Sequence, residues 1–264
     1  MSVLLAADQL HFAYGAGRPV LSGASLAVRA GEVVALLGAN GSGKSTLLKL
    51  LLGLIKPLMG GVILAGQPLA SWSRREVARR IAYVPQNQAM PFPYRVRDLV
   101  ALGRISQRGL FDNLIRRDRK AVDAAMTRLG IADLADRPYT ELSGGQRQLC
   151  LIARALAQES SVIVMDEPAT GLDYGNQWRL LALIKDLAAE GRAFIQSTHH
   201  PDHVLGGASR AVLLHDGTVV ADGIPSAVIT PEFIQRLYGL RVARHALPDG
   251  SLALAPDMGA AHHV

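Results

Sequence analysis

The stretch GANGSGKST, Gly38 to Thr46, constrains this chain more than any other feature. It has Gly, four residues, Gly, Lys and Ser, which is the pattern of a phosphate-binding loop. The apolar run VVALL at 33–37 precedes it and the apolar stretch TLLKLLLGLI follows it, so a buried strand should enter the loop and a helix should leave it. Backbone N–H groups can converge on phosphate oxygens there, and the helix N-terminus favours negative charge. A glycine-rich turn that contained lysine by chance would lack this context.

Lys44 and Ser45 carry the chemistry of this loop. A lysine at this position binds the β- and γ-phosphates of a nucleotide, and the serine after it places its hydroxyl on Mg²⁺. The pattern therefore predicts a nucleotide site with Lys44 on the phosphates and Ser45 Oγ on the metal ion.

A second pattern, SVIVMDEPA, places two acids at the end of another strand. VIVM at 162–165 suits a strand that is buried on both faces, and Asp166 and Glu167 follow it directly. Open α/β sheets bind ligands at the carboxyl ends of their strands, so Asp166 is expected near the magnesium ion. Successive residues that leave a strand face different ways, so Glu167 can face an attacking water as a general base. A solvated loop is the ordinary alternative for such a pair.

Strand-like and helix-like segments alternate along the chain, which is typical of an α/β fold with a mainly parallel sheet. Apolar runs at 193–197 and 211–214 predict further buried strands, whereas shorter segments between 18 and 34 and at 62–69 predict an antiparallel β layer. From 87 to 141 the pattern changes to helices. We expect one domain over 1–264, with a nucleotide-binding core formed by 1–86 and 142–264 and a helical subdomain inserted at 87–141.

Net charge and hydropathy limit the cellular compartment and the kinds of partner that such a chain can have. No stretch reaches the roughly 18 uncharged apolar residues that span a bilayer, because Lys49, Lys56 and Pro57 interrupt the most hydrophobic region. The first residues lack a secretory signal pattern and the single Cys150 cannot form an internal disulfide, which favours a reducing cytosol. The net charge of +6 suits an anionic membrane surface, a nucleotide or nucleic acid. Because the charges are scattered, an ordinary solvated surface is preferred over a nucleic-acid stripe.

The stretch LSGGQRQ at 142–148 predicts a second anion-binding turn far along the chain from the first. Ser143 suits the N-cap of a helix that runs through GQRQLCLIARALAQ. Its hydroxyl and the N–H groups of Gly144 and Gly145 can present donors to an anion. A plain capping sequence would explain LSGG if it stood alone, so the meaning of this turn depends on the other motifs.

The ordered set of motifs resembles the ATP-binding cassette (ABC) ATPases over nearly the whole chain. The set is YG with Tyr14, GANGSGKST, VPQ with Gln86, LSGGQRQ, VIVMDEP, GLD with Asp173 and STHH with His199. The resemblance implies a P-loop nucleotide triphosphatase core, ATP and Mg²⁺ as cofactors, and in-line attack of water on the γ-phosphoryl group. It also implies a head-to-tail dimer that sandwiches two ATP molecules, in which the LSGGQ turn of one copy closes on the phosphate loop of the second copy.

Matched residue by residue, the resemblance also assigns roles. Glu167 is expected to act as general base, His199 to contact the γ-phosphate, and Lys44 to complete the catalytic set. The expected metal ligands are Ser45, Gln86 and Asp166. The residues expected to bind the nucleotide are Tyr14, Gly38, Asn40, Gly41, Ser42, Gly43, Lys44, Ser45, Thr46, Gln86, Ser143, Gly144, Gly145, Gln146 and Asp173.

Three further positions bear on this match. Tyr14 is expected to stack on adenine, with Phe12 nearby. Relatives often have Asp where this chain has His200, and many have Thr where it has Ala169. Neither departure is expected to contact phosphate, so the assigned roles stand.

A free single cassette most resembles the ATPase of an importer. The stretches YVPQNQAMPFPYRVRDLVALGR, STHHPDHVL and LYGLRVARHALPDGSLALAP resemble the group that serves iron–siderophore, haem, cobalamin and molybdate systems. The resemblance implies integral-membrane permease subunits, reached through a cleft beside the helical insert, and indirectly a substrate-binding protein. It places the chain peripherally at the cytoplasmic face of the inner membrane. Iron chelates are the expected cargo, with cobalamin and oxyanions as alternatives.

Three other classes stay open. A nucleotide kinase would share the phosphate loop and the sheet, but it has no use for LSGGQ. Cassettes that act on DNA ends carry long coiled-coil insertions and ribosomal ones carry two fused cassettes; this chain has neither, so no nucleic-acid partner is expected. An inactive regulatory cassette is disfavoured by the intact Lys44, Asp166, Glu167 and His199.

Overall fold

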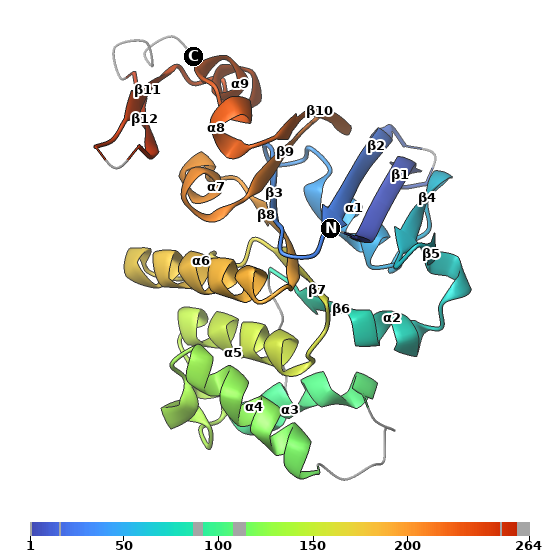
Figure 1. The fold of residues 1–264 in the computed structure, drawn as a ribbon, viewed down its shortest axis with the longest axis vertical. Helices are drawn as coiled ribbons and strands as arrows, with labels where there is room; N and C mark the ends of the chain where they lie inside the picture. The colour runs from blue at the N-terminus through green and yellow to red at the C-terminus, as the bar shows by residue number, and fades with distance from the viewer. Residues whose placement is uncertain (1, 16, 87–91, 108–114, 249, 258–264) are drawn as a thin grey trace.

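A six-stranded sheet of order β10-β9-β3-β8-β7-β6 forms the centre of the computed structural model, which describes residues 2–15, 17–86, 92–107, 115–248 and 250–257 (Figure 1). Its strands are β3 (Val33–Leu37), β6 (Ile81–Val84), β7 (Val162–Asp166), β8 (Ala193–Thr198), β9 (Arg210–His215) and β10 (Thr218–Gly223). Neighbouring strands are parallel except β9 and β10. Every residue of β3, β7 and β8 is buried, which explains their continuous apolar sequences.

An antiparallel sheet of order β2-β1-β4-β5 packs beside the central sheet. Its strands are β1 (Val3–Ala13), β2 (Pro19–Arg29), β4 (Met59–Leu64) and β5 (Gln67–Pro68). Helix α1 (Lys44–Leu51) lies with the two sheets in one apolar core, to which Leu10, Leu36 and Leu48 contribute. The predicted antiparallel layer is confirmed.

A helical layer covers another part of the central sheet (Figure 1). Its helices are α3 (Val96–Ala101), α4 (Arg116–Arg128), α5 (Gly144–Ala157) and α6 (Tyr174–Ala189), with the 3₁₀ segments η2 (Leu102–Gln107), η3 (Ala132–Leu134) and η4 (Tyr139–Glu141). Leu99, Met126 and Ile152 pack in one core with Ile163 of the sheet. Helices α3 and α4 fall within 87–141, where the helical insert is expected; its boundaries stay a prediction, and 87–91 and 108–114 lie outside the described residues.

The C-terminal part of the described chain adds small helices and a hairpin. These elements are α7 (Pro201–Gly207), α8 (Pro225–Val228), α9 (Pro231–Tyr238), β11 (Val242–Ala246) and β12 (Leu252–Pro256). Two short elements lie earlier in the chain, between β5 and β6: η1 (Leu69–Ser71) and α2 (Arg74–Arg80). The hairpin was not expected from the sequence. None of the helices in the described part of the chain is long and apolar enough to span a membrane.

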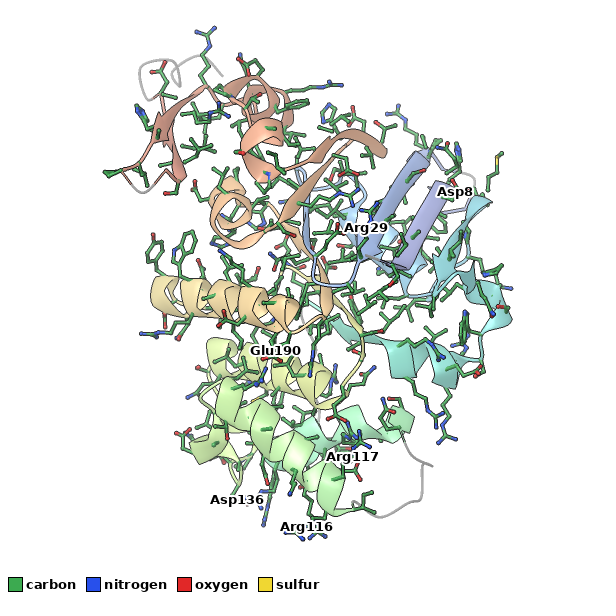
Figure 2. All side chains as sticks on the ribbon, viewed as in Figure 1. Asp8, Arg29, Arg116, Arg117, Asp136 and Glu190 are labelled. Atoms are coloured by element: carbon green, nitrogen blue, oxygen red, sulfur yellow. The ribbon has the colours of Figure 1, made fainter. Side chains whose placement is uncertain are left out.

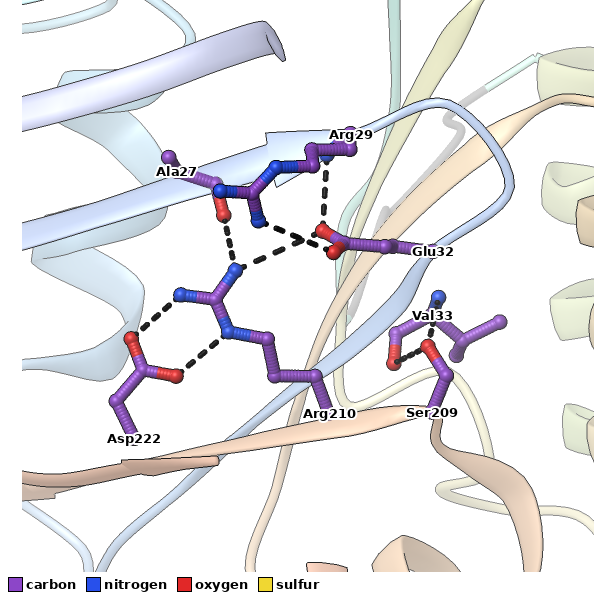
Figure 3. Close-up of polar contacts among 7 residues, drawn as sticks. All are labelled: Ala27, Arg29, Glu32, Val33, Ser209, Arg210 and Asp222. Atoms are coloured by element: carbon purple, nitrogen blue, oxygen red, sulfur yellow. Dashed lines mark hydrogen bonds and ion pairs between the residues drawn. The ribbon is translucent and has the colours of Figure 1, made fainter. Parts of the chain in front are cut away.

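Arg210 on β9 ties the two sheets together at one edge (Figure 3). Its Nε and Nη2 donate to the two carboxylate oxygens of Asp222 on β10, both at 2.6 Å. Its Nη1 donates to the carbonyl oxygen of Ala27 on β2 at 2.8 Å, and Glu32 lies 3.6 Å away. This bidentate pair raises the pKa of Arg210 above its ordinary value. The antiparallel layer is therefore fixed to the central sheet by a polar link as well as by the apolar core.

Candidate nucleotide site

The loop 38–43 joins the buried strand β3 to helix α1. A Cβ on Gly38 would lie 2.4 Å from the carbonyl oxygen of Leu214 and 2.6 Å from Ser42 Oγ. Gly43 caps the helix with a φ of 103°, and a Cβ there would lie 2.9 Å from the carbonyl oxygen of Val20. Only glycine fits either position, because a side chain would displace the backbone that shapes the loop.

Lys44 lies inside the loop, with its side chain curled back on the backbone. Its Nζ donates to the carbonyl oxygens of Gly38 at 2.7 Å and Ala39 at 3.0 Å, and the residue is buried. Burial lowers the pKa of Lys44, while the negative charges of Glu167 and Asp166 act in the opposite direction. The ammonium group therefore lies within electrostatic reach of both acids.

Asp166, at the end of β7, is held by Ser197 on the neighbouring strand β8. Ser197 Oγ donates to Asp166 Oδ1 at 2.5 Å and accepts the backbone N–H of Glu167 at 2.9 Å. Glu167 has a φ of 48°, a left-handed conformation that residues with a Cβ adopt rarely. Sequence reasoning missed Ser197. The signal is the strand register, in which Asp166 and Ser197 are partners.

Three side chains surround the Glu167 carboxylate. Gln86 Nε2 and Thr170 Oγ1 donate to Oε2 at 3.0 Å and 3.3 Å, and His199 Nδ1 lies 3.1 Å from Oε1. Because a carboxylate oxygen only accepts, this contact requires a proton on His199 Nδ1. The structure thus brings together Gln86, Glu167 and His199, which the motifs singled out, and adds Thr170, which they did not.

His199 begins a stack of three histidines. Its ring centroid lies 4.1 Å from that of His200, which lies 4.7 Å from that of His203. His203 Nε2 contacts Gln177 Oε1 at 3.2 Å. Burial lowers the pKa of His203 to about 4 and also lowers the pKa of His200, and the neighbouring histidines act in the same direction. His203 is therefore neutral at neutral pH and can support the rings above it by packing.

The second predicted turn lies at the start of α5. Ser143 Oγ accepts the N–H of Gln146 at 3.3 Å, and Gln146 Oε1 accepts the N–H of Ser143 at 3.1 Å, so the predicted N-cap is confirmed. A Cβ on Gly145 would lie 3.2 Å from the carbonyl oxygen of Gly171, which leads towards Asp173. Within the described residues of this one chain, no hydrogen bond joins the turn to the phosphate loop.

Asp173 and Tyr14 lie at two further edges of the site. Asp173 caps α6, since its Oδ1 accepts the N–H of Asn176 at 2.8 Å. The Tyr14 hydroxyl lies 3.4 Å from Thr46 Oγ1, and its ring meets Phe12 edge to face at 4.8 Å. Tyr14 is 54% exposed and lies beside Thr46 at the start of α1. Stacking on adenine stays a prediction.

The residues expected to bind Mg²⁺ have the right chemistry. Ser45, Gln86 and Asp166 offer a hydroxyl, an amide oxygen and a carboxylate, and hard oxygen donors are those that Mg²⁺ prefers. In the described part of the chain, no cluster of three or more His, Cys, Asp or Glu could hold a metal. Mg²⁺ that is bound through one carboxylate and substrate phosphates needs no such cluster. The buried Ser42 Oγ has no partner among the described residues, so it can also donate to a phosphate oxygen.

A family model and several known proteins match this chain over most of its length. The family model for ABC transporters matches residues 21–170, more than half of the chain. The ferric enterobactin transport ATP-binding protein of Escherichia coli K12 is 40% identical over 238 residues, which are 90% of this chain and 88% of that protein. The cobalamin import ATP-binding protein of Halobacterium salinarum is 39% identical over 243 residues. That match covers 91% of this chain but spans only 61% of the relative's length.

A solved structure assigned as a metal-chelate type ABC transporter in an inward-facing conformation shares the fold, with a TM-score of 0.83. It is 33% identical, and the match covers 97% of this chain and 98% of that chain. The predicted α/β fold is therefore confirmed. Since the family model and the relatives agree, this chain belongs to the ABC transporter family.

Proposed function

We propose that this chain is the ATP-hydrolysing subunit of an importer for a metal chelate, with an iron–siderophore complex or haem as cargo. The observation that carries the activity is the Glu167 carboxylate, held by Gln86, Thr170 and His199 at the sheet edge that Lys44 also faces. This arrangement gives a general base, an orienting histidine and a cation for phosphate in one place.

Hydrolysis follows from the positions of these groups. The phosphates of ATP would lie in the loop 38–43 against Lys44, and Glu167 would take the proton of a water aimed at the γ-phosphorus. Ser45, Gln86 and Asp166 would hold Mg²⁺, which supplies charge neutralisation on the phosphate oxygens. Ser197 keeps both acids in place, because one hydroxyl bonds the Asp166 carboxylate and the Glu167 N–H.

A second copy of the chain would complete the site. The Ser143 hydroxyl and the N–H groups of the α5 N-terminus are donors that no phosphate-loop atom uses within the described chain. In a head-to-tail dimer these donors would meet the γ-phosphate held by the partner copy, where a helix N-terminus favours an anion. The dimer would then depend on ATP.

An apolar groove of about 680 Å³ offers a place for a permease. Leu54, Ile55, Trp72 and Val77 line it, and 58% of Leu54 is exposed. Such a groove fits the apolar face of a short helix. Strand β6 supplies part of its wall and ends two residues before Gln86. Movement of a docked helix would therefore reach Gln86 and, through it, Glu167. The chain would work at the cytoplasmic face of the inner membrane, with a substrate-binding protein on the opposite side.

Glu167→Gln tests the catalytic proposal, because it keeps the shape of the side chain and removes the base. We expect the loss of hydrolysis by roughly 10²- to 10⁴-fold with ATP binding intact, and an ATP-dependent dimer by light scattering. Glu190→Gln, at an exposed glutamate paired with Arg128, is the matched control and should hydrolyse ATP normally. A Glu167→Gln chain that binds ATP but stays monomeric would contradict the sandwich dimer.

Uptake by cells that carry Glu167→Gln tests the cargo. Loss of labelled ferric siderophore uptake with normal cobalamin uptake is the expected result. The opposite pattern would favour cobalamin, the second candidate, because the Halobacterium salinarum relative is a cobalamin import protein.

Leu54→Asp tests the groove. The variant should leave the ATPase activity of the isolated chain unchanged and abolish the stimulation of that activity by the permease. Unchanged stimulation would place the permease elsewhere.

A further inference from the structure

Cationic side chains from two separate segments gather around η2. Helix α2 and the first turns of α4 supply Arg74, Arg75, Arg79, Arg116, Arg117, Arg119 and Lys120. We call these seven residues the basic surface; Arg80 of α2 instead stacks on Trp72, 4.0 Å from the ring centroid. The two segments are far apart in sequence, so their charges look scattered along the chain although they lie around one short element.

Hydrogen bonds fix both cationic segments to η2. The Nε atoms of Arg75 and Arg79 donate to the carbonyl oxygen of Ser106 at 3.5 Å and 2.9 Å. On the other side, Arg104 of η2 pairs with Asp118 of α4 at 3.0 Å, and both residues are buried. Figure 2 shows Arg116 and Arg117 at the end of the molecule where α4 begins. The basic surface is therefore held in place by the fold.

Most of these charges are not neutralised by the chain itself. Arg74, Arg116, Arg119 and Lys120 form no ion pair with any described residue, and Arg117 has only a 3.6 Å contact with Glu159. Arg75 and Arg79 use only Nε in their bonds to Ser106, so their outer nitrogens remain available. Four free cations and two partly free guanidiniums on one surface favour an anionic partner.

Exposed aliphatic side chains belong to η2 and to the start of α4 as well. Leu102 and Ile105 on η2 are 40% and 41% exposed, and Ile115, at the N-cap of α4, is 58% exposed. Cations beside exposed aliphatic groups are the combination that binds the headgroup region of an anionic bilayer. Arg74 also lines the apolar groove, so the basic surface adjoins the face proposed for the permease.

We propose that the basic surface binds the headgroups of anionic phospholipids, with Leu102, Ile105 and Ile115 against the apolar boundary below them. Each Lys or Arg near an anionic membrane contributes roughly a fivefold gain in partition. Removing three of the free cations should therefore weaken binding by about 10²-fold, and the effect should shrink at high salt. The proposal requires neither ATP hydrolysis nor transport, so it stands or falls separately from the proposed function.

Vesicle cosedimentation of the full chain tests the electrostatic part. The probes are vesicles of phosphatidylcholine alone and of phosphatidylcholine with phosphatidylglycerol. The test variant is Arg116→Gln, Arg119→Gln, Lys120→Gln, and the control is Lys185→Gln, Arg236→Gln, Arg241→Gln, which removes the same charge from α6 and the C-terminal part. Thermal melting checks that both variants fold. We expect only the first to lose binding to the anionic vesicles.

A fluorescent label tests the apolar part. Cys150 is the only cysteine of the chain and is fully buried, so Ile105→Cys gives one reactive thiol for a polarity-sensitive dye. Its emission should shift to the blue with anionic vesicles, whereas a dye at Leu247→Cys, a residue 44% exposed beside β11, should not respond.

Three outcomes would overturn the proposal. Equal binding to neutral and anionic vesicles would remove the role of charge. Equal losses in the two triple variants would show a net-charge effect with no defined surface. Loss of permease association by the test variant, with vesicle binding unchanged, would assign these cations to a protein partner.

Discussion

Ser197→Ala removes the hydroxyl that holds both acids of the site. The variant loses the bond to the charged Asp166 carboxylate, worth about 1.5–3 kcal/mol, and leaves the Glu167 N–H without its acceptor, which costs about 1–3 kcal/mol. Water can enter beside Asp166 and recover part of this, so we expect the free energy of unfolding to fall by about 2–4 kcal/mol.

The same change should be visible in thermal melting and in hydrolysis. At roughly 2.1 cal/mol/K per residue, 264 residues give an unfolding entropy of about 0.55 kcal/mol/K, so Tm should fall by about 4–7 °C. Loss of the fixed Glu167 backbone should lower kcat by about 10- to 100-fold, because the proposed base would move out of line with the attacking water.

Ser209→Ala is the matched control. Ser209 Oγ also makes two hydrogen bonds, to the N–H and the carbonyl oxygen of Val33, but neither partner is charged and the residue is exposed (Figure 3). This variant should melt close to the parent and hydrolyse ATP normally. If Ser197→Ala melts no lower than Ser209→Ala and keeps full activity, the role given to Ser197 is wrong.

Three further predictions concern other parts of the chain. Gly38→Ala should abolish binding of a fluorescent ATP analogue, because its Cβ would meet the carbonyl oxygen of Leu214 at 2.4 Å; full affinity would contradict this. Arg104→Ala should lower the free energy of unfolding in urea by about 3–5 kcal/mol, because buried Asp118 loses the guanidinium; a loss like that at an exposed arginine would refute it. With a pKa of about 4 in place of 6.5, His203 stays neutral in the native chain while the unfolded chain takes up a proton, so stability present above pH 6.5 is lost as the pH falls towards 4. His203→Gln should lose less stability over that window in urea titrations, and equal losses in both chains would count against the assignment.

The sequence predicted those parts of the fold and site that depend on local pattern. The apolar run before Gly38 and the polar cap at Ser143 each determine a local structure, so strand, loop and helix ends could be placed. The lateral order of strands could not, because β3 pairs with β8 and β9, whose residues lie more than 150 positions away. The contact between Ser197 and Asp166 could not be predicted either, since only the pairing of β7 with β8 places the two residues side by side.

Two other features could not be predicted from the sequence, each for a different reason. In the hairpin β11–β12, β11 is largely exposed and mixes charged and small side chains, whereas β12 is half-buried and contains only apolar residues, so neither strand shows the apolar–polar alternation that marks a half-buried sheet. The basic surface needs α2 and α4 to meet at η2, and Arg104 and Asp118, which join α4 to η2, carry no pattern in the sequence. Both features depend on tertiary contacts.

In the proposed dimer, the capping box at Ser143 would divide the two functions of a hydroxyl group between two molecules. The oxygen already accepts from Gln146 inside its own chain, whereas its hydrogen is free to point away. An aspartate would serve the first purpose equally well, since it is as good an N-cap as serine, but it has no hydrogen to give and would repel a phosphate. In that dimer, folding and nucleotide closure would place separable demands on one side chain, and only a residue that both accepts and donates would meet them together.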